Sequence, residues 1–448
     1  MDLKKYKLGD IADIINGATP STSCEDNYDG EIVWITPKDL SEQKAKYVER
    51  GSRNITQEGF NSCSAQMIPA YNILMSSRAP IGLLAINTAE CCTNQGFKNI
   101  VVDRSICDVD FLYYYLKYHI KEIEALGSGT TFKEVSKASL QQFEITIPSL
   151  DVQKHIASIL ADIDQKIALN RAINDNLEAM AKQLYDYWFV QFDFPNMEGK
   201  PYKSSGGKMV WNDKLKREIP GNWLHKDIKS FMRIFTGKKD VSKAMPGPYK
   251  FFSCAPEPIT SDEYIYDGAA VLVSGNGSYT GRVNFYKGKM DLYQRTYACV
   301  VKEDESTIPF FYYTLRYLFQ PIFSGGKHGS SIPYIVLGDL ADFMFAYNVD
   351  VVKLFVENIS AIFNNRIVLQ QEIENLTKQR DELLPLLMNG QVSVNYHLYV
   401  SLYIDSLILN YTLNARLYER NIFRRCNPPI RIQFYSRANC DGSRDSKR

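Results

Sequence analysis

The side chains in this sequence best suited to chemistry are polar residues that form two sets, one in each half of the chain. Arginine and lysine match the hydrogen-bonding edge of guanine, and asparagine and glutamine match that of adenine. The first set is Arg78, Asn94, Gln95 and Lys98, and the second is Asn276, Tyr279, Arg282, Gln294 and Arg295. Each residue alone is typical of ordinary loop surface, but two corresponding sets together predict a surface that contacts the edges of bases.

Small hydroxyl side chains beside glycine form a second kind of candidate, just ahead of a long helical stretch in each half. These residues are Ser128, Thr130, Thr131 and Lys133 in the first half, and Ser330 and Ser331 in the second. Backbone amides in such turns can approach phosphate closely, because no bulky side chain covers them. We therefore expect phosphate contacts from these turns.

Motifs typical of enzymes are weak in this chain. The motif 427–430 resembles that of adenine methyltransferases, but Ile430 replaces the aromatic residue that would stack on a flipped base. The stretch 275–281 resembles a dinucleotide loop, but its third glycine is one residue late, so we predict a turn between strands. Scattered cysteines without a C-x-x-C pair predict free thiols, and the five histidines are far apart. We predict no catalytic residue and no metal site.

The elements that must position the polar sets occur twice. Residues 111–118 and 310–317 share an aromatic pattern, and 129–184 share ten identities with the stretch 200 residues later. The repeated aromatic residues, including Phe111 and Phe310, recur at helical spacing and predict core positions. Short β-like runs precede a long helix in each half, at 31–35, 72–75 and 99–102, and again at 270–274, 282–286 and 298–302.

Both long helical stretches carry an apolar stripe with spacings of three and four residues. The first, over 152–189, includes Ile156, Ile163, Ile167 and Leu177, and the second includes Val356, Phe363, Ile367 and Leu376. Two such stripes in one chain are most economically buried against each other. The stretch 191–222 is rich in Pro, Gly and Ser and predicts a linker.

Composition and charge exclude several classes of protein. A content of 45% hydrophobic and 23% charged residues is that of a globular protein rather than a disordered or fibrous one. The most apolar stretch, 396–413, contains Asp405, so we predict no membrane span. The net charge is +1, but residues 397–448 hold nine Lys and Arg against four Asp and Glu, so the preceding 396 residues carry −4. An autonomous, tight DNA-binding protein usually has a strong basic excess.

Four stretches resemble the specificity subunits of type I restriction-modification systems. They are 34–40, 77–82 with 93–97, 184–195 with 199–207, and 383–392, and the resemblance covers residues 1 to about 396. Pro148 and Gln153 match the family's first helix entry, although Val152 stands where glutamate is common. Asn348 and Lys353 depart from the pattern at the second entry, which puts detailed contacts there in doubt but not the fold.

The resemblance implies an α+β protein with two mixed α/β target recognition domains. Two long conserved helices would separate the domains and pair as an antiparallel coiled coil, giving an internal pseudo-two-fold repeat. The expected parts are recognition domain 1 (1–150), the first spacer helix (151–190), the linker (191–222), recognition domain 2 (223–350), the second spacer helix (351–389) and a C-terminal tail of unknown role (390–448). We expect the tail after 396 to be dispensable, because it has no counterpart in the repeat.

The resemblance also implies a cytoplasmic, non-catalytic subunit that reads a bipartite, asymmetric site in double-stranded DNA. Its helices, through the apolar residues named above, would dock two methyltransferase subunits, and nuclease/translocase subunits would complete the complex. The assembly would be a DNA adenine methyltransferase and an ATP-dependent site-specific endonuclease. S-adenosylmethionine, ATP and magnesium would belong to the partners, with no cofactor in this chain. Two alternatives remain open: a self-contained methyltransferase or nuclease, and a scaffold that does not read DNA.

Overall fold

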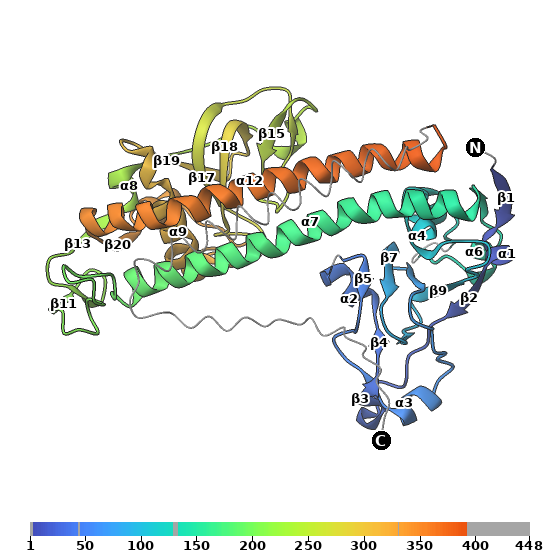
Figure 1. Ribbon diagram of the computed structural model, residues 1–448. Coiled ribbons are helices and arrows are strands. Elements are labelled where there is room, and N and C mark those ends of the chain that lie inside the picture. The colour runs from blue at the N-terminus through green and yellow to red at the C-terminus, as the bar shows by residue number, and fades with distance from the viewer. Residues whose placement is uncertain (1–2, 44, 129–132, 330, 392–448) are drawn as a thin grey trace, which may run out of the picture. The chain divides into compact units, whose positions relative to one another are not determined.

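The computed structural model describes residues 3–43, 45–128, 133–329 and 331–391 (Figure 1). Thr130, Thr131, Ser330, the motif at 427–430 and the tail after 391 lie outside these residues. The chain divides into two compact units, which are described separately below. Of the described residues, the first unit contains those up to Arg171 and those from 370 to 391, and the second contains Ala172–Leu369. No helix in the described ranges is long and apolar enough to cross a membrane.

The first unit is built on a five-stranded sheet. The strand order is β2 (Ala12–Asn16), β9 (Phe97–Val102), β6 (Ile73–Ser77), β7 (Ile81–Asn87) and β5 (Tyr47–Val48). A second, two-stranded sheet pairs β1 (Lys4–Lys7) with β10 (Glu144–Ile147), and a third pairs β4 (Trp34–Ile35) with β8 (Cys92–Thr93). Ile73 and Met75 enter the core on one face of the main sheet, and Leu74 enters a smaller core on the other. Because successive side chains of a strand point to opposite faces, a strand covered on both sides reads as a continuous apolar run.

The second unit contains a six-stranded sheet with the same pairing order among its first five strands. The order is β14 (Met232–Thr236), β19 (Thr296–Val301), β17 (Tyr266–Ser274), β18 (Val283–Leu292), β15 (Tyr249–Phe252) and β16 (Ile259–Ser261). Two further pairs are β13 (Leu224–Asp227) with β20 (Met344–Tyr347), and β11 (Met209–Asn212) with β12 (Arg217–Pro220). Residues 275–281 form the connection between β17 and β18, which confirms the predicted turn.

Short helices accompany the sheets in each unit. In the first unit they are α1 (Leu8–Ile11), α2 (Pro37–Gln43), α3 (Gln57–Asn61), α4 (Val109–Tyr118), α5 (Ile120–Ala125) and α6 (Lys137–Gln141). In the second they are α8 (Ile228–Phe231), α9 (Ile308–Thr314), α10 (Gln320–Phe323) and α11 (Leu337–Ala341), with a π-helical turn at Leu315–Phe319. Phe111 in α4 and Phe310 in α9 are almost fully buried, which confirms that the repeated aromatic motif forms core.

The long helices α7 (Leu150–Tyr185) and α12 (Val349–Met388) each contribute to both units (Figure 1). In the first unit Ile163 and Ile167 of α7 pack with Ile373 and Leu376 of α12. In the second unit the end of α7 and the π-helical turn Asp186–Val190 pack against the beginning of α12. The segments that meet within each unit therefore run in opposite directions.

The start of each long helix is held by an amide side chain. Gln153 is fully buried; its Oε1 accepts from the backbone amide of Asp108 at 2.9 Å, and its Nε2 donates to the Pro148 carbonyl at 2.8 Å. At the second helix Asn348 Oδ1 accepts from the amides of Asp350 and Val351 at 3.0 and 3.1 Å. Asn348 thus caps the start of α12, although it departs from the family pattern at this position.

Candidate nucleic-acid interface

Three segments of the first unit meet where β6 ends. The amide of Ser77 donates to the carbonyl of Gly96 at 2.7 Å, and the amide of Val135 donates to the carbonyl of Ser77 at 3.0 Å. These bonds hold the turn 94–96 and the segment 133–135 on either side of Arg78. The predicted base-contacting residues of this half therefore lie together, although they come from distant parts of the chain.

The same backbone bonds occur in the second unit where β17 ends. The amide of Gly275 donates to the carbonyl of Arg295 at 2.8 Å, and the amide of Ile335 donates to the carbonyl of Gly275 at 2.9 Å. The bonds match those of the first unit at sequence offsets of 198 to 200. The matched positions that follow are Arg78 with Asn276, Gln95 with Gln294, Lys98 with Tyr297, and Glu134 with Tyr334.

The cluster of the first unit is charged. Lys98, whose side chain is only 8% exposed, forms an ion pair with Glu134 at 3.0 Å from Nζ to Oε1. Arg78 is 37% exposed, and its Nη1 lies 3.9 Å from Oε2 of the same carboxylate. Glu134 was not predicted as a site residue, because a carboxylate between two cations is recognisable only once the fold has brought them together.

The remaining candidates of the first unit differ in exposure and in the hydrogen bonds that their side chains form within the unit. Asn94 is half-buried, and its Oδ1 accepts from the amide of Gly96 at 2.9 Å, which shapes the turn. Gln95 is exposed at the tip of that turn, where its Oε1 accepts a hydrogen bond from the Thr19 hydroxyl. Lys133 is also exposed. Gln95 and Lys133 are thus accessible to a ligand, whereas Asn94 acts mainly on the turn.

In the second unit the guanidinium of Arg282 is bound to its own chain. Its Nη2 donates to the carbonyls of Ala255 and Pro256 at 2.7 and 3.1 Å. Burial lowers the pKa of this guanidinium. Tyr279 is 48% exposed, and its ring lies 5.7 Å from the Arg282 guanidinium carbon. Arg282 therefore supports the loop beneath Tyr279, and Tyr279 is the accessible member of the pair.

The other candidates of the second unit belong to the segments that contain Asn276, Tyr297 and Tyr334, the positions that match Arg78, Lys98 and Glu134. Asn276 is half-buried and forms a β-bridge with Tyr334. Gln294 and Arg295 are exposed in the turn that corresponds to 94–96. Ser331, which precedes Tyr334 by three residues, is also exposed. Asn276, Tyr297 and Tyr334 are uncharged, so this cluster differs in charge from that of the first unit.

The apolar residues expected to dock partner subunits pack inside the chain. Ile156, Ile163, Ile167, Val356, Phe363 and Leu376 are each less than 9% exposed, and Leu177 and Ile367 are partly buried. They stabilise the packing within each unit and are not available to a second protein. A partner bound to these helices would have to contact other side chains.

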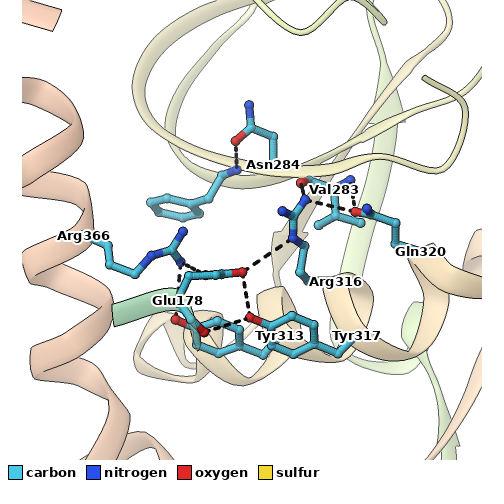
Figure 2. A network of polar contacts seen from close by, with 9 residues as sticks. Glu178, Val283, Asn284, Tyr313, Arg316, Tyr317, Gln320 and Arg366 are labelled. Carbon is cyan, nitrogen blue, oxygen red and sulfur yellow. Dashed lines mark hydrogen bonds and ion pairs between the residues drawn. The ribbon is translucent and has the colours of Figure 1, made fainter. Parts of the chain in front are cut away.

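A polar network that sequence patterns did not indicate joins α7, α12 and the π-helical turn Leu315–Phe319 in the second unit. Figure 2 shows the Glu178 carboxylate paired with Arg366 and, at 3.6 Å, with Arg316. The Tyr317 hydroxyl donates to Glu178 at 2.6 Å. Burial and the neighbouring Glu178 raise the pKa of Tyr317, so its hydroxyl keeps its proton as a donor.

The first unit contains a comparable arrangement. The Tyr114 hydroxyl of α4 donates to Asp164 of α7 at 2.6 Å, and Arg380 of α12 donates to the same carboxylate at 2.8 Å. Lys46 lies 3.2 Å from the Tyr114 hydroxyl. In each unit, a carboxylate of α7 therefore binds both an arginine of α12 and a tyrosine, which lies in α4 in the first unit and in the π-helical turn Leu315–Phe319 in the second.

The described part of the chain offers little for metal chemistry. No group of three or more His, Cys, Asp and Glu side chains within it lies close enough to hold a metal ion. The seven cysteines in this part are free thiols.

Comparison with known proteins supports the resemblance seen in the sequence. Residues 1–179 match the type I restriction modification DNA specificity domain. The MjaIX specificity subunit of Methanocaldococcus jannaschii is 28% identical over 422 residues, which cover 88% of this chain and 94% of that protein. Both matches are to specificity proteins of type I restriction-modification systems. The resemblance found in the sequence is thereby confirmed.

Two further comparisons give similar proteins of the same kind. The EcoDI specificity subunit of Escherichia coli is 31% identical over 182 residues, which cover 39% of this chain and 40% of that protein. The crystal structure of the type I restriction-modification S subunit of M. genitalium has a TM-score of 0.55 at 17% identity. The match covers 86% of this chain and 96% of that one, so this chain and the S subunit share a fold.

Proposed function

We propose that this chain is a specificity subunit that reads a bipartite, asymmetric DNA site through the two matched clusters, one in each unit. The observation that supports this most strongly is the repeated backbone arrangement around residues 77–78 and 275–276, which carries different side chains in the two units. A common scaffold with different polar groups is suited to recognising two different short sequences. Direct readout depends on such groups, because each base pair presents its own pattern of donors and acceptors in the major groove.

The proposed organisation has recognition domains at 1–150 and 223–350, with spacer helices at 151–190 and 351–389. We interpret the helices as an antiparallel coiled coil and the two halves as an internal pseudo-two-fold repeat. The matching strand orders of the two sheets and the opposed helix segments within each unit support this interpretation. The linker at 191–222 would connect the halves, and the tail from 390 onward has no assigned role.

The proposed complex contains two methyltransferase subunits, with nuclease/translocase subunits, in the cytoplasm. This chain would be non-catalytic, and the assembly would methylate adenine and cleave DNA with ATP. S-adenosylmethionine, ATP and magnesium would be bound by the partners. The charge of −4 before residue 397 supports a division in which partners supply many of the phosphate contacts.

The first prediction concerns the methylated sequence. Cells that carry this chain with its methyltransferase subunits should methylate adenine in a motif with two short specified halves, differing in sequence and separated by unspecified base pairs. Genome-wide detection of modified bases reads the motif directly, and the same cells without this chain serve as the control. A continuous or palindromic motif would contradict bipartite readout.

A further inference from the structure

The carboxylate of Glu134 lies between two cations of different accessibility. It pairs with the buried ammonium of Lys98 at 3.0 Å and lies 3.9 Å from the guanidinium of Arg78. Ser77 Oγ also lies within 3.4 Å of Glu134 Oε1. Glu134 is itself 39% exposed, so the three charged groups form a continuous cluster that reaches the surface.

The two cations cannot serve the same purpose. The ammonium of Lys98 is covered and balanced by the carboxylate, so it contributes little to contact with a ligand. The guanidinium of Arg78 is exposed and more loosely held, and its rigid fork can give two hydrogen bonds to one acceptor group. In the major groove, the O6 and N7 atoms of guanine form the acceptor pair that fits this fork.

The second unit has no charge at the three matched positions. Asn276 takes the place of Arg78, Tyr297 that of Lys98, and Tyr334 that of Glu134. The Tyr297 hydroxyl lies 3.3 Å from the carbonyl of Ile335, so it supports the backbone in place of an ion pair. The charged cluster is therefore a property of the first unit and is not required by the shared backbone.

We propose that Glu134 is a specificity-determining residue that positions Arg78 to read a guanine in the half-site of the first unit. Its carboxylate restrains the guanidinium and cancels the charge of Lys98, so that Arg78 is the group presented to the base edge. The inference rests on the proposed function, and it names one base pair and the side chains that select it. Tyr334, in the matched position, serves the other half-site without a charge.

The test compares Glu134→Gln and Arg78→Lys in the full chain, co-expressed with the methyltransferase subunits. Glu134→Gln keeps the size of the side chain and removes its charge, and Arg78→Lys keeps the charge and loses the fork. Both should relax the methylated motif at the same guanine position by roughly tenfold relative to the other bases. The double variant should relax it no further than either single one, and the other half-site should stay unchanged.

Two controls separate this role from a structural one. Glu31→Gln removes an exposed carboxylate of the same unit and should leave the motif as it is. Tyr334→Phe should leave the first half-site unchanged. Loss of methylation at all sites equally, with a lower yield of the complex, would mean that Glu134 acts only on folding and would overturn the proposal.

The remaining outcomes distinguish this proposal from the proposed function. If the wild-type chain gives no split motif, bipartite readout itself fails. If the wild type gives a split motif but Glu134→Gln leaves it unchanged, or relaxes a different position from Arg78→Lys, only the role of Glu134 fails.

Discussion

Glu178 is a single residue on which the polar packing of the second unit depends. Its carboxylate binds two arginines and a tyrosine hydroxyl, and it is 21% exposed, while Arg366 is 17% exposed (Figure 2). Charges removed this far from water are stable only while they are paired. The loss of one carboxylate therefore leaves positive charge from two different elements without a counterion.

The prediction at this site concerns stability. Glu178→Gln should lower the free energy of unfolding by about 2–3 kcal/mol, because Arg366 stays partly buried after its partner loses its charge. Urea denaturation of the purified chain measures this. Glu382→Gln is the matched control on α12: its pair with Lys378 is 67% and 74% exposed, and it should change stability by less than about 1 kcal/mol. Equal effects of the two variants would contradict the argument.

Residue types indicated a set of candidate positions, but not which of these side chains are exposed. Gln95 and Tyr279 are exposed, as a contact role requires, whereas Lys98 is buried beneath Glu134. Arg282 is held by two carbonyls. Base-edge chemistry depends on residue type and can be seen in a sequence, but these ion pairs and hydrogen bonds join positions far apart in the chain.

The secondary-structure elements were predicted more completely than the contacts of their side chains. The expected helix 152–189 corresponds to α7 with its π-helical extension to Val190, and Pro385 lies inside α12, which continues to Met388. Each β-like run in the two halves overlaps an observed strand, because strand propensity and turn residues are local signals, although the run 31–35 spans β3 and β4. The apolar stripes also predicted burial correctly. They could not indicate what each stripe packs against, since core and docking faces look the same in sequence.

The interior position of these stripes changes what can be tested on the helices. Tyr185 of α7 lies in the core of the second unit, and Ile156 of the same helix lies in the core of the first. Deleting α7 would therefore remove core from both units, and the loss of a partner after such a deletion would say nothing about docking. Exposed apolar residues are better probes, and Val368 of α12 is 59% exposed.

We expect Val368→Glu to reduce co-purification of the methyltransferase subunit about tenfold without lowering the thermal stability of this chain. An exposed valine on a long helix gives apolar area that a partner subunit can bury. A carboxylate at the centre of such a contact would lose its water without gaining a hydrogen bond or an opposite charge. Affinity capture from co-expressing cells measures retention. Gln371→Glu, at an exposed polar position of the same helix, should leave it unchanged. Undiminished capture with Val368→Glu would exclude this residue from the docking surface.

At the scale of the whole molecule, the two long helices connect the two units that we propose to read DNA. Both α7 and α12 pass from one unit into the other, at Arg171–Ala172 and at Leu369–Gln370. Two recognition surfaces that enter the major groove from the same side should have centres about one helical turn of DNA apart, ~34 Å or ~10 base pairs. If each reads roughly four base pairs, a gap of about six unread pairs remains, and the helices would set its length.

The last prediction follows from this geometry. Four residues inserted into both helices, between Arg171 and Ala172 and between Leu369 and Gln370, add about one turn and roughly 6 Å to each. Because the helices pack in opposite directions, the insertions must be paired to keep their stripes in contact. The gap in the methylated motif should lengthen by about one to two base pairs, while both half-site sequences stay the same, since the clusters around Arg78 and Asn276 are not altered. Sequencing of modified bases measures both properties at once. A changed half-site with an unchanged gap would mean that the helices do not set the spacing.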